Sequence, residues 1–505
     1  MVFSSAIFIF GYLPLVFLGY ALIPKRFLIL FFFIVNLLFY GWGEPVYLFL
    51  MLFSIALNYC AALLIARFPT RKKRLLACCV AVNVLLLIWF KYAGLFAETL
   101  THAIPSTAAA LGLFSAPKLP IGISFYTFQA MAYVIDVYRG EIKAERGFMK
   151  FGVFIALFPQ LIAGPIARFS DVSARLEAGM SRDVRAAEID RGVKVFICGL
   201  SKKLLLANPT GQLWETLSRT TGQNGVAGAW LGLVTYAFHI YFDFSGYSDM
   251  AVGLGRILGI RFPENFNYPY ISKSVTDFWR RWHITLSSWF RDYVYIPLGG
   301  NRKGLKRSVA NLFIVWFLTG LWHGAAWNFA LWGLYFAVIL TIEKAFLLPA
   351  FDKIKLPGFA RRVYSIVLIL IGWRLFTLND MSQAAACFGE LFRARGGGAL
   401  AAPAVSAGLS AADGGRLILG GAFTYDSYRY ALAYLPLLII CALASTPLPK
   451  RAWAALFWKG RDGPPPASDG AGVTLLESAG ALILFLLCVS AVTAQSYNPF
   501  IYFRF

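Results

Sequence analysis

The sequence predicts an all-α polytopic integral membrane protein. Of its 505 residues, 59% are hydrophobic, 17% aromatic and only 14% charged, and the mean hydropathy is +0.64. Apolar runs of about 20 residues, the length that crosses a bilayer as a helix, recur along the whole chain. Reading them with a sliding window gives roughly ten to twelve transmembrane helices, with shorter apolar segments that favour re-entrant or interfacial helices. The composition excludes an ordinary soluble globular protein.

The positive charge of the chain is concentrated in short loops. The formal net charge is +22, which by itself suits a nucleic-acid-binding protein. Because Lys and Arg gather between apolar runs, however, the positive-inside rule explains the charge better, and no nucleic-acid partner is expected. Membrane lipid is the expected surrounding, and anionic headgroups would be attracted by the same residues.

The basic clusters also predict the orientation of the first helices. Lys25 and Arg26 follow the first apolar run, and a second cluster occupies 67–74. Placing both clusters in the cytoplasm puts the N-terminus outside. Counting onward, the apolar run 148–165 has basic sequence on both sides. A re-entrant segment is the favoured interpretation, because Pro159, Gly164 and Pro165 would interrupt a spanning helix.

The cysteines show no pattern of a disulfide framework or a metal site. There is no Cys-x-x-Cys motif and no histidine at metal-ligand spacing. We interpret them as small core residues and expect no metal. The seven are Cys60, Cys78, Cys79, Cys198, Cys387, Cys441 and Cys488.

His283 lies in a segment rich in tryptophan and arginine. Ser274 and Asp277 stand at the spacing of a capping box, which predicts the start of a helix. If that helix continues, Trp279, His283, Leu286 and Phe290 share one face, and Arg280 and Arg281 point toward other faces.

His323 lies in an apolar run between Gly320 and Gly324, with Trp316 before it and Trp327 after it. A lone histidine on an apolar face is more often a core residue than a catalyst. Ionisable residues in membrane segments are rare, however, and they mark functional sites. Two histidines in Trp-rich segments joined by one polar loop therefore predict a shared site, and imidazole titrates near neutral pH, as a general base requires.

A second polar group lies further upstream. His239 and Asp243 are four residues apart, so they share a helix face, and Asp249 follows. A buried ion pair or a hydrogen bond that orients neighbouring helices is the favoured interpretation. A proton relay is the alternative.

Several motifs follow one another along the chain. They are Leu119–Gln129, Phe158–Pro165, Asp243–Asp249, Asp277–His283 (DFWRRWH), Leu321–Asn328 (LWHGAAWN) and Pro499–Phe505. Together they resemble, in the same order, the motifs of the membrane-bound O-acyltransferase family, and of its bacterial alginate O-acetyltransferase branch in particular. The resemblance covers nearly the whole chain.

The resemblance implies transfer of an acetyl group from acetyl-CoA, as a substrate and not a bound cofactor, to a hydroxyl. His323 matches the family's defining histidine and is expected to be the base, while His283 is expected to orient the acceptor or stabilise charge. A central tunnel is expected around them. Direct transfer and an acyl-histidine intermediate both stay open. The further substrate or tunnel candidates are Trp279, Arg280, Arg281, Trp322, Trp327, Asn328, Asp243 and Asp249.

The resemblance also implies a cellular location and a biological role. Acetyl groups would cross the bacterial inner membrane to O-acetylate an exported, alginate-like polysaccharide, through a periplasmic partner protein. Peptidoglycan or another envelope polymer is an alternative acceptor. A proton-coupled transporter or channel through His239, Asp243 and Asp249 is an alternative of another class, and the absence of visible internal repeats weighs against it.

One domain is expected over residues 1–505. Within it, 1–118 form N-terminal spans, 119–340 the catalytic core and 341–505 C-terminal spans. A Gly/Ala-rich segment at about 394–422 predicts a flexible loop.

Overall fold

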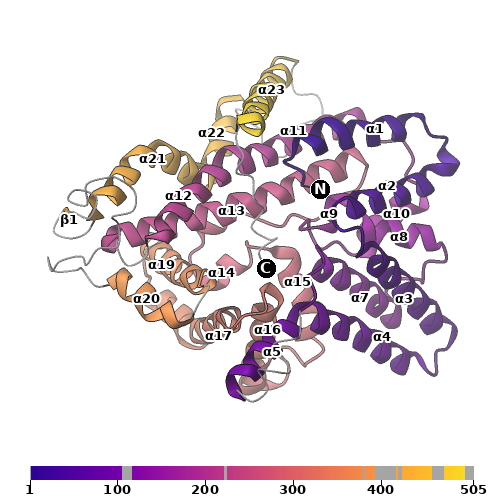
Figure 1. The fold of residues 1–505 in the computed structure, drawn as a ribbon, viewed down its shortest axis with the longest axis horizontal. Coiled ribbons are helices and arrows are strands. Elements are labelled where there is room, and N and C mark those ends of the chain that lie inside the picture. Colours follow the sequence, from indigo (N-terminus) through magenta and orange to yellow (C-terminus); the bar gives the residue numbers. More distant parts are fainter. Residues whose placement is uncertain are drawn as a thin grey trace.

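The computed structural model describes residues 2–104, 116–220, 224–378, 381–392, 417–418, 423–457 and 471–494. Nearly all of these residues are helical (Figure 1). The strands in the described part are β1 (Leu417–Ile418) and β2 (Phe423–Thr424), which pair antiparallel. The predicted all-α class is confirmed. Apart from 417–418, the predicted loop lies outside the described residues, as does the motif Pro499–Phe505.

Helices able to cross a membrane confirm a polytopic membrane protein. By length and composition there are 7 among the described residues, fewer than the ten to twelve expected, because other apolar runs form short or broken helices or helices that carry more polar residues. One shorter apolar helix covers Ile7–Leu22. The seven are Lys25–Gly43, Leu48–Arg67, Lys72–Thr101, Gly225–Ile257, Trp327–Lys353, Tyr425–Ala444 and Leu475–Ala494.

The N-terminal helices α1 to α4 lie together on one side of the molecule, and α5 lies near α16 (Figure 1). Where α3 and α4 meet, the buried amides of Asn58 and Asn83 donate to each other's oxygens over 3.2 and 3.0 Å. Such reciprocal bonds satisfy polar groups that water cannot reach in a bilayer. The elements are η1 (Ile7–Tyr12), α1 (Leu13–Leu22), η2 (Lys25–Phe27), α2 (Leu28–Gly43), α3 (Leu48–Arg67), α4 (Lys72–Leu87), η3 (Ile88–Tyr92) and α5 (Ala93–Ala103).

The segment predicted to be re-entrant is a broken helix. After α7 (Ile123–Arg139), the chain forms α8 (Phe148–Ala156), leaves the helix at Leu157 and forms the single turn α9 (Phe158–Leu161). At 1.5 Å per residue, α8 is about 14 Å long, roughly half of a bilayer's hydrocarbon core. Neither piece can span alone, which agrees with the interpretation drawn from Pro159.

Two long antiparallel segments form the spine behind the site. One comprises α11 (Ala186–Ser201), η5 (Lys202–Ala207) and α12 (Asn208–Arg219), and the other is α13 (Gly225–Ile257). They approach closely because glycines face backbone: a Cβ on Gly246 would lie 2.7 Å from the Gly199 carbonyl oxygen. The short helix α10 (Phe169–Glu177) precedes them.

The C-terminal half contains the helices around His283 and His323. Figure 1 shows α14 and α15 near the centre of the view, between the N-terminal helices and α16, α17 and α19. The elements are η6 (Pro269–Ile271), α14 (Val275–Trp279), α15 (Ile284–Phe290), η7 (Arg291–Tyr295), α16 (Gly304–His323), α17 (Trp327–Ile342), η8 (Glu343–Leu347), α18 (Leu348–Lys353), α19 (Gly358–Phe376), η9 (Met381–Gln383), α20 (Ala384–Phe392), α21 (Tyr425–Ala444), α22 (Leu448–Phe457) and α23 (Ala471–Ala494).

The small residues around His323 allow α16 and α17 to touch through their backbones. A Cβ on Gly320 would lie 2.2 Å from the Phe329 carbonyl oxygen, and one on Gly333 would lie 2.2 Å from that of Trp316. Both distances are far inside van der Waals contact. The glycine before His323 therefore lets α17 approach, and it fixes where the end of α16 lies.

We predict that Gly320→Ala destabilises the protein by about 1–3 kcal/mol, because the added methyl group forces two packed helices apart. Gly480→Ala in α23 is the matched control, since nothing lies within 4 Å of its Cβ position. Thermal unfolding in detergent, followed by size-exclusion chromatography, measures both. Equal midpoints for the two variants would contradict the proposed close approach.

Candidate functional site

The segment that carries His283 begins as predicted and then departs from the prediction. Ser274 caps the helix, with its hydroxyl accepting from the Asp277 N–H over 2.9 Å. Helix α14 ends at Trp279, however, and His283 has left-handed backbone angles, with φ +45°. The expectation of one continuous helix, with Trp279, His283 and Leu286 on one face, is therefore wrong.

A neighbouring extended segment causes the break. The Asn267 N–H donates to the Arg281 carbonyl over 2.9 Å, and the Ile284 N–H donates to the Asn265 carbonyl over 3.0 Å. Between these bonds, Phe266 and Trp282 form a β-bridge. These contacts take up the Arg281 carbonyl and the Ile284 N–H, which a continuous helix would bond within itself, and they satisfy the backbone in an apolar setting. The N–H groups of Arg280 and Trp282 still donate to carbonyls of α14.

A buried carboxylate holds the start of α14. Glu343, fully buried in η8, accepts from the N–H groups of Val275 and Thr276 over 2.7 Å each. It also accepts from the Thr276 hydroxyl over 2.6 Å. A carboxylate at a helix N-terminus satisfies free N–H groups and is favoured by the helix dipole. Glu343 therefore anchors the segment that leads to His283.

Asn265 determines which nitrogen of His283 carries a proton. Its side-chain oxygen accepts from the Thr285 N–H over 3.2 Å, which identifies that atom as the amide oxygen. The same oxygen lies 3.1 Å from His283 Nδ1, so Nδ1 is the nitrogen that donates. In the neutral ring, Nε2 then holds a lone pair. Nε2 is buried and has no hydrogen-bond partner among the described residues.

His323 is the last residue of α16 and lies among aromatic rings. The ring centroids of Trp322 and Trp332 are each 5.0 Å from that of His323, and Phe376 is 5.3 Å away. Trp322 also contacts His283 at 5.7 Å between centroids, so its ring lies next to both histidines. These contacts hold the imidazole in an apolar surrounding.

Both histidines line one large cavity, which we call the inner cavity. It has a volume of about 1030 Å³ and extends from His283 and His323 to Asn301, Lys344 and Asp352. Those last residues lie close to the basic loop before α16, which the positive-inside rule assigns to the cytoplasm. The inner cavity thus connects both histidines with the basic side of the protein, where the positive-inside rule predicts the cytoplasm.

A second, smaller space, the outer cavity, meets His323 from the opposite direction. Its volume is about 90 Å³, and it is lined by Lys91, Trp322, His323 and residues 119–125. Residues 119–125 precede or begin α7, which ends at the basic Arg139. The outer cavity therefore lies at the other end of α7 from the cytoplasmic side. His323 belongs to the walls of both cavities.

Five of the predicted candidates line these cavities. Trp279, Arg280, His283 and His323 line the inner cavity, and Trp322 and His323 line the outer one. The predicted pairing of the two histidines in one site is thus what the geometry shows. Their roles in the reaction stay predictions.

The other candidates line neither cavity. Arg281 forms an ion pair with Asp277 at 2.8 Å. The Asn328 amide donates to the Phe376 carbonyl over 3.1 Å, which ties α17 to α19. Trp327 is 54% exposed, so it faces outward from the packed core.

Asp243 and Asp249 belong to the spine. Asp243 Oδ1 lies 2.6 Å from Lys203 Nζ, with both side chains almost fully buried, and Asp249 pairs with Lys202 at 2.6 Å. Both lysines come from η5. His239 Nδ1 lies 2.8 Å from the Ala207 carbonyl oxygen and therefore donates to it. Asp243 thus forms a buried ion pair with Lys203, a partner that sequence reasoning missed, and His239 forms a hydrogen bond to η5. The choice between a structural role and a proton relay stays a prediction.

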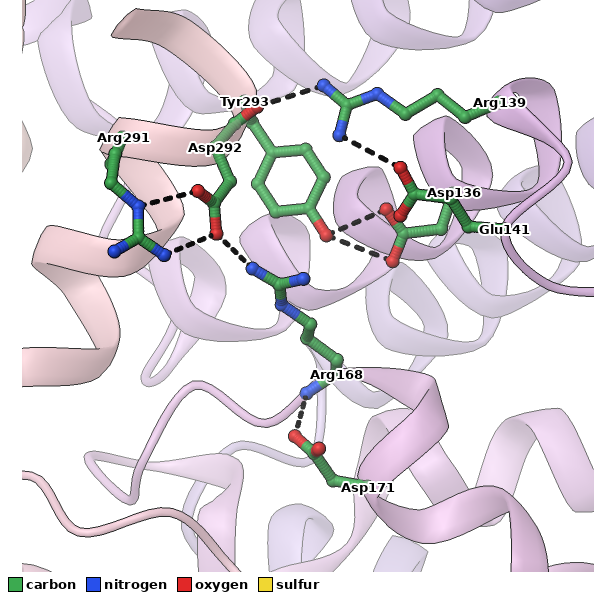
Figure 2. A network of polar contacts seen from close by, with 8 residues as sticks. All are labelled: Asp136, Arg139, Glu141, Arg168, Asp171, Arg291, Asp292 and Tyr293. Atoms are coloured by element: carbon green, nitrogen blue, oxygen red, sulfur yellow. Dashed lines mark hydrogen bonds and ion pairs between the residues drawn. The ribbon is translucent and has the colours of Figure 1, made fainter. Parts of the chain in front are cut away.

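A polar network lies next to the inner cavity and touches it through Arg291 (Figure 2). Asp292 accepts from Arg291, which lines that cavity, and from Arg168. The Tyr293 hydroxyl donates to both oxygens of Asp136 over 2.8 and 2.9 Å. The guanidinium of Arg139 donates to the Asp292 carbonyl over 2.9 Å. The network joins η7 to the end of α7.

The charges of this network set the ionisation of Asp292. Partial burial disfavours its charged form, but hydrogen bonds and attraction from Arg291 and Arg168 outweigh burial and lower the pKa of Asp292. The carboxylate is therefore the stable form at neutral pH. Asp171 lies on the other side of Arg168, and there burial dominates and raises the pKa of the Asp171 carboxyl.

Sequence reasoning missed several residues of the site. Lys91 and Glu343 carried a usable signal, because each is an ionisable residue in an otherwise apolar run. Asn265 carried none, since its role depends on a segment that follows α13 and returns to residues 281–285. Among the described residues, no three His, Cys, Asp or Glu side chains are grouped to hold a metal ion.

Comparison with known proteins finds a matching family and several relatives. The profile of the membrane-bound O-acyltransferase family matches residues 141–377. A probable alginate O-acetylase of Pseudomonas putida is 37% identical, with both chains covered over their full length. A peptidoglycan O-acetyltransferase of Helicobacter pylori is 36% identical over 68% of this chain and 71% of its own. A teichoic acid D-alanyltransferase of Bacillus subtilis is 32% identical over 45% of this chain and 59% of its own.

The fold, the family match and these relatives thus define a multi-pass membrane enzyme of the O-acyltransferase class. The chain belongs to the membrane-bound O-acyltransferase family.

We predict that His283→Asn keeps the fold but lowers acyl transfer at least tenfold, because asparagine tolerates left-handed backbone angles while the imidazole is lost. His283→Val should unfold more easily as well, by about 1–2 kcal/mol, because a β-branched residue is strained at φ +45°. Transfer rates and unfolding midpoints of both variants test this. Equal stability of the two variants would contradict the strained backbone.

We predict that Asp292→Asn lowers the unfolding midpoint at pH 7. A carboxylate whose pKa is lowered in the folded state stabilises it above the unfolded pKa of about 3.9. That contribution disappears as the pH falls through the still lower folded pKa. The difference between wild type and Asp292→Asn should therefore shrink when unfolding is measured below about pH 4. A difference that grows on acidification would refute this account.

Proposed function

We propose that the protein transfers acetyl groups from cytoplasmic acetyl-CoA across the bacterial inner membrane, for O-acetylation of an exported, alginate-like polysaccharide. The observation that carries the proposal is the position of His323 in the walls of both cavities. A donor that enters from the cytoplasm and an acceptor that arrives from the other side can meet only at such a residue.

The inner cavity suits an elongated donor with phosphate groups. Arg280, Arg291 and Lys344 line its wall, and all three side chains are exposed. Guanidinium and ammonium groups bind phosphate oxygens through charge-assisted hydrogen bonds. Aromatic side chains, among them Trp279 and Trp316, line the cavity toward the histidines. The nucleotide end of acetyl-CoA would bind the basic residues, and its thioester would reach His323.

We propose different roles for the two histidines in the reaction. We assign His323 as the base that takes the proton from the attacking hydroxyl. His283 holds its proton on Nδ1 against Asn265, so its Nε2 can accept a hydrogen bond from a substrate O–H or N–H. Of the two roles expected for His283, orientation of a substrate is therefore the one that we propose.

The size of the outer cavity supports a carrier between the enzyme and the polymer. A space of about 90 Å³ holds a small group and is too small for a polysaccharide chain. We propose that a periplasmic partner presents a hydroxyl there, receives the acetyl group and passes it to the polymer. The choice of an alginate-like polymer is supported by the Pseudomonas putida relative, which matches over its full length.

Peptidoglycan is the second candidate acceptor, because the Helicobacter pylori relative covers two thirds of the chain at similar identity. A transporter or channel through His239, Asp243 and Asp249 has less support. Both carboxylates bind lysines of η5, and none of the three residues lines the inner or the outer cavity.

The proposal predicts that purified protein in liposomes releases coenzyme A from radiolabelled acetyl-CoA and that His323→Ala loses this activity at least a hundredfold. The physical reason is loss of the base that makes the hydroxyl nucleophilic, a contribution of about 10²–10⁴. Asn328→Ala is the control. Asn328 lies at the start of α17, close to His323 in the sequence, but it lines neither cavity. Unchanged turnover in His323→Ala would refute the assignment.

The side of the membrane is tested with oriented vesicles. Label supplied as acetyl-CoA on the basic, cytoplasmic face should appear on an acceptor enclosed on the other face. Transfer only to acceptors on the same face as acetyl-CoA would refute transport of the acetyl group across the membrane.

A further inference from the structure

We propose that Lys91 is a catalytic residue of the outer cavity, where its ammonium group holds the oxyanion that forms on the acyl carbonyl during transfer. This inference rests on the proposed function. It assigns a residue to the negative charge that acyl transfer creates on the carbonyl oxygen, a role that the proposed function gives to neither histidine.

The location of Lys91 follows from α4 and η3. Counting from the cytoplasmic Lys72, Lys91 lies roughly 28 Å along the helix, near the far side of a hydrocarbon core of about 30 Å. The π-helical turn η3 brings Lys91 and Tyr92 against the end of α16. The Lys91 ammonium donates to the Trp322 carbonyl and the Tyr92 hydroxyl to the Leu321 carbonyl. Such π-helical turns are frequent at functional sites.

Lys91 is a basic residue in an apolar span, without a carboxylate to balance a charge on its amine. Among the described residues it forms no ion pair with a carboxylate; its partners are the Trp322 carbonyl and the Trp322 ring, whose centroid is 5.8 Å from Nζ. An ammonium group has three N–H bonds, and the carbonyl uses one. A charge held in this way is costly, and in membrane segments it indicates a function.

The wall of the outer cavity holds a second hydrogen-bond donor, and this one has no acceptor among the described residues. Trp322 Nε1 is buried and has no hydrogen-bond partner in the part of the chain that the structure describes. Lys91, Trp322 and His323 line the outer cavity together. The cavity therefore combines a base with a positive group and an unpaired N–H, and the group that would complete it is negatively charged and small.

The tetrahedral intermediate of acyl transfer has this character. The hydroxyl oxygen of the acceptor bonds to the thioester carbonyl carbon, and its proton passes to His323. The carbonyl π electrons move to oxygen, which becomes the oxyanion that Lys91 and Trp322 hold. When the carbonyl re-forms, the C–S bond breaks and the thiolate of coenzyme A takes the proton from His323. Lys91 stays protonated throughout, so charge and protons balance.

The competing interpretation is that Lys91 only caps α16. A variant of Tyr92 distinguishes this capping role from the catalytic role. Tyr92 lies in the same turn and caps the neighbouring carbonyl, but it does not line the outer cavity. Tyr92→Phe therefore removes a cap alone. Lys91→Gln removes the charge and keeps a donor for the Trp322 carbonyl, and Lys91→Arg keeps the charge.

The experiment measures steady-state turnover of acetyl-CoA by full-length protein in liposomes, for wild type and these three variants, with folding checked by thermal unfolding. Loss of an oxyanion donor costs about 10²–10³ in kcat. We expect that loss in Lys91→Gln with little change in KM for acetyl-CoA, most of the activity kept in Lys91→Arg, and near-normal kcat in Tyr92→Phe.

Two results would overturn the inference. One is similar, small losses in Lys91→Gln and Tyr92→Phe, which would make Lys91 a cap. The other is a rise in KM at constant kcat, which would make it a binding residue for the ground state. Failure of the proposed function looks different, because His323→Ala would then keep wild-type turnover whatever the Lys91 variants do.

Discussion

The structure depends on how the chain is held away from helical geometry between α14 and α15. In a bilayer, irregular backbone persists only where other protein groups satisfy it. Here Asn265 and Asn267 bond the backbone at Ile284 and Arg281, and Glu343 holds the first N–H groups of α14. These bonds turn His283 toward the inner cavity. Without them the segment would be one helix, and its polar residues would spread around the helix surface.

The second requirement is a fixed end for α16. Gly320 lets α17 approach on one side, while Lys91 and Tyr92 bond the last carbonyls on the other. His323 is therefore placed by packing and by hydrogen bonds together. This position lets one imidazole face a large basic cavity and a small one at the opposite end of α7. The proposed transfer needs such a meeting point, because its donor and its acceptor would arrive from opposite sides.

The remaining buried charges support the frame of the site. Lys203 with Asp243 and Lys202 with Asp249 join η5 to α13, and the network around Asp292 joins η7 to α7. A paired charge costs little compared with an unpaired one in an apolar setting. Lys91 differs from these lysines because its described partners are a carbonyl and an aromatic ring. We therefore assign Lys91 a catalytic role, and the paired lysines a structural one.

The sequence by itself determined the membrane class, the family and the pair His283 and His323. Composition, basic loops and local motifs depend on residues that are close together in the sequence, so they can be recognised without the tertiary structure. Only the tertiary structure decided that α14 stops at Trp279, that Lys203 pairs with Asp243, and that Asn265, Lys91 and Glu343 belong to the site. Each of these depends on contacts between segments far apart in the chain. Helical periodicity assumes that backbone bonds stay local, and it fails where a distant segment supplies them instead.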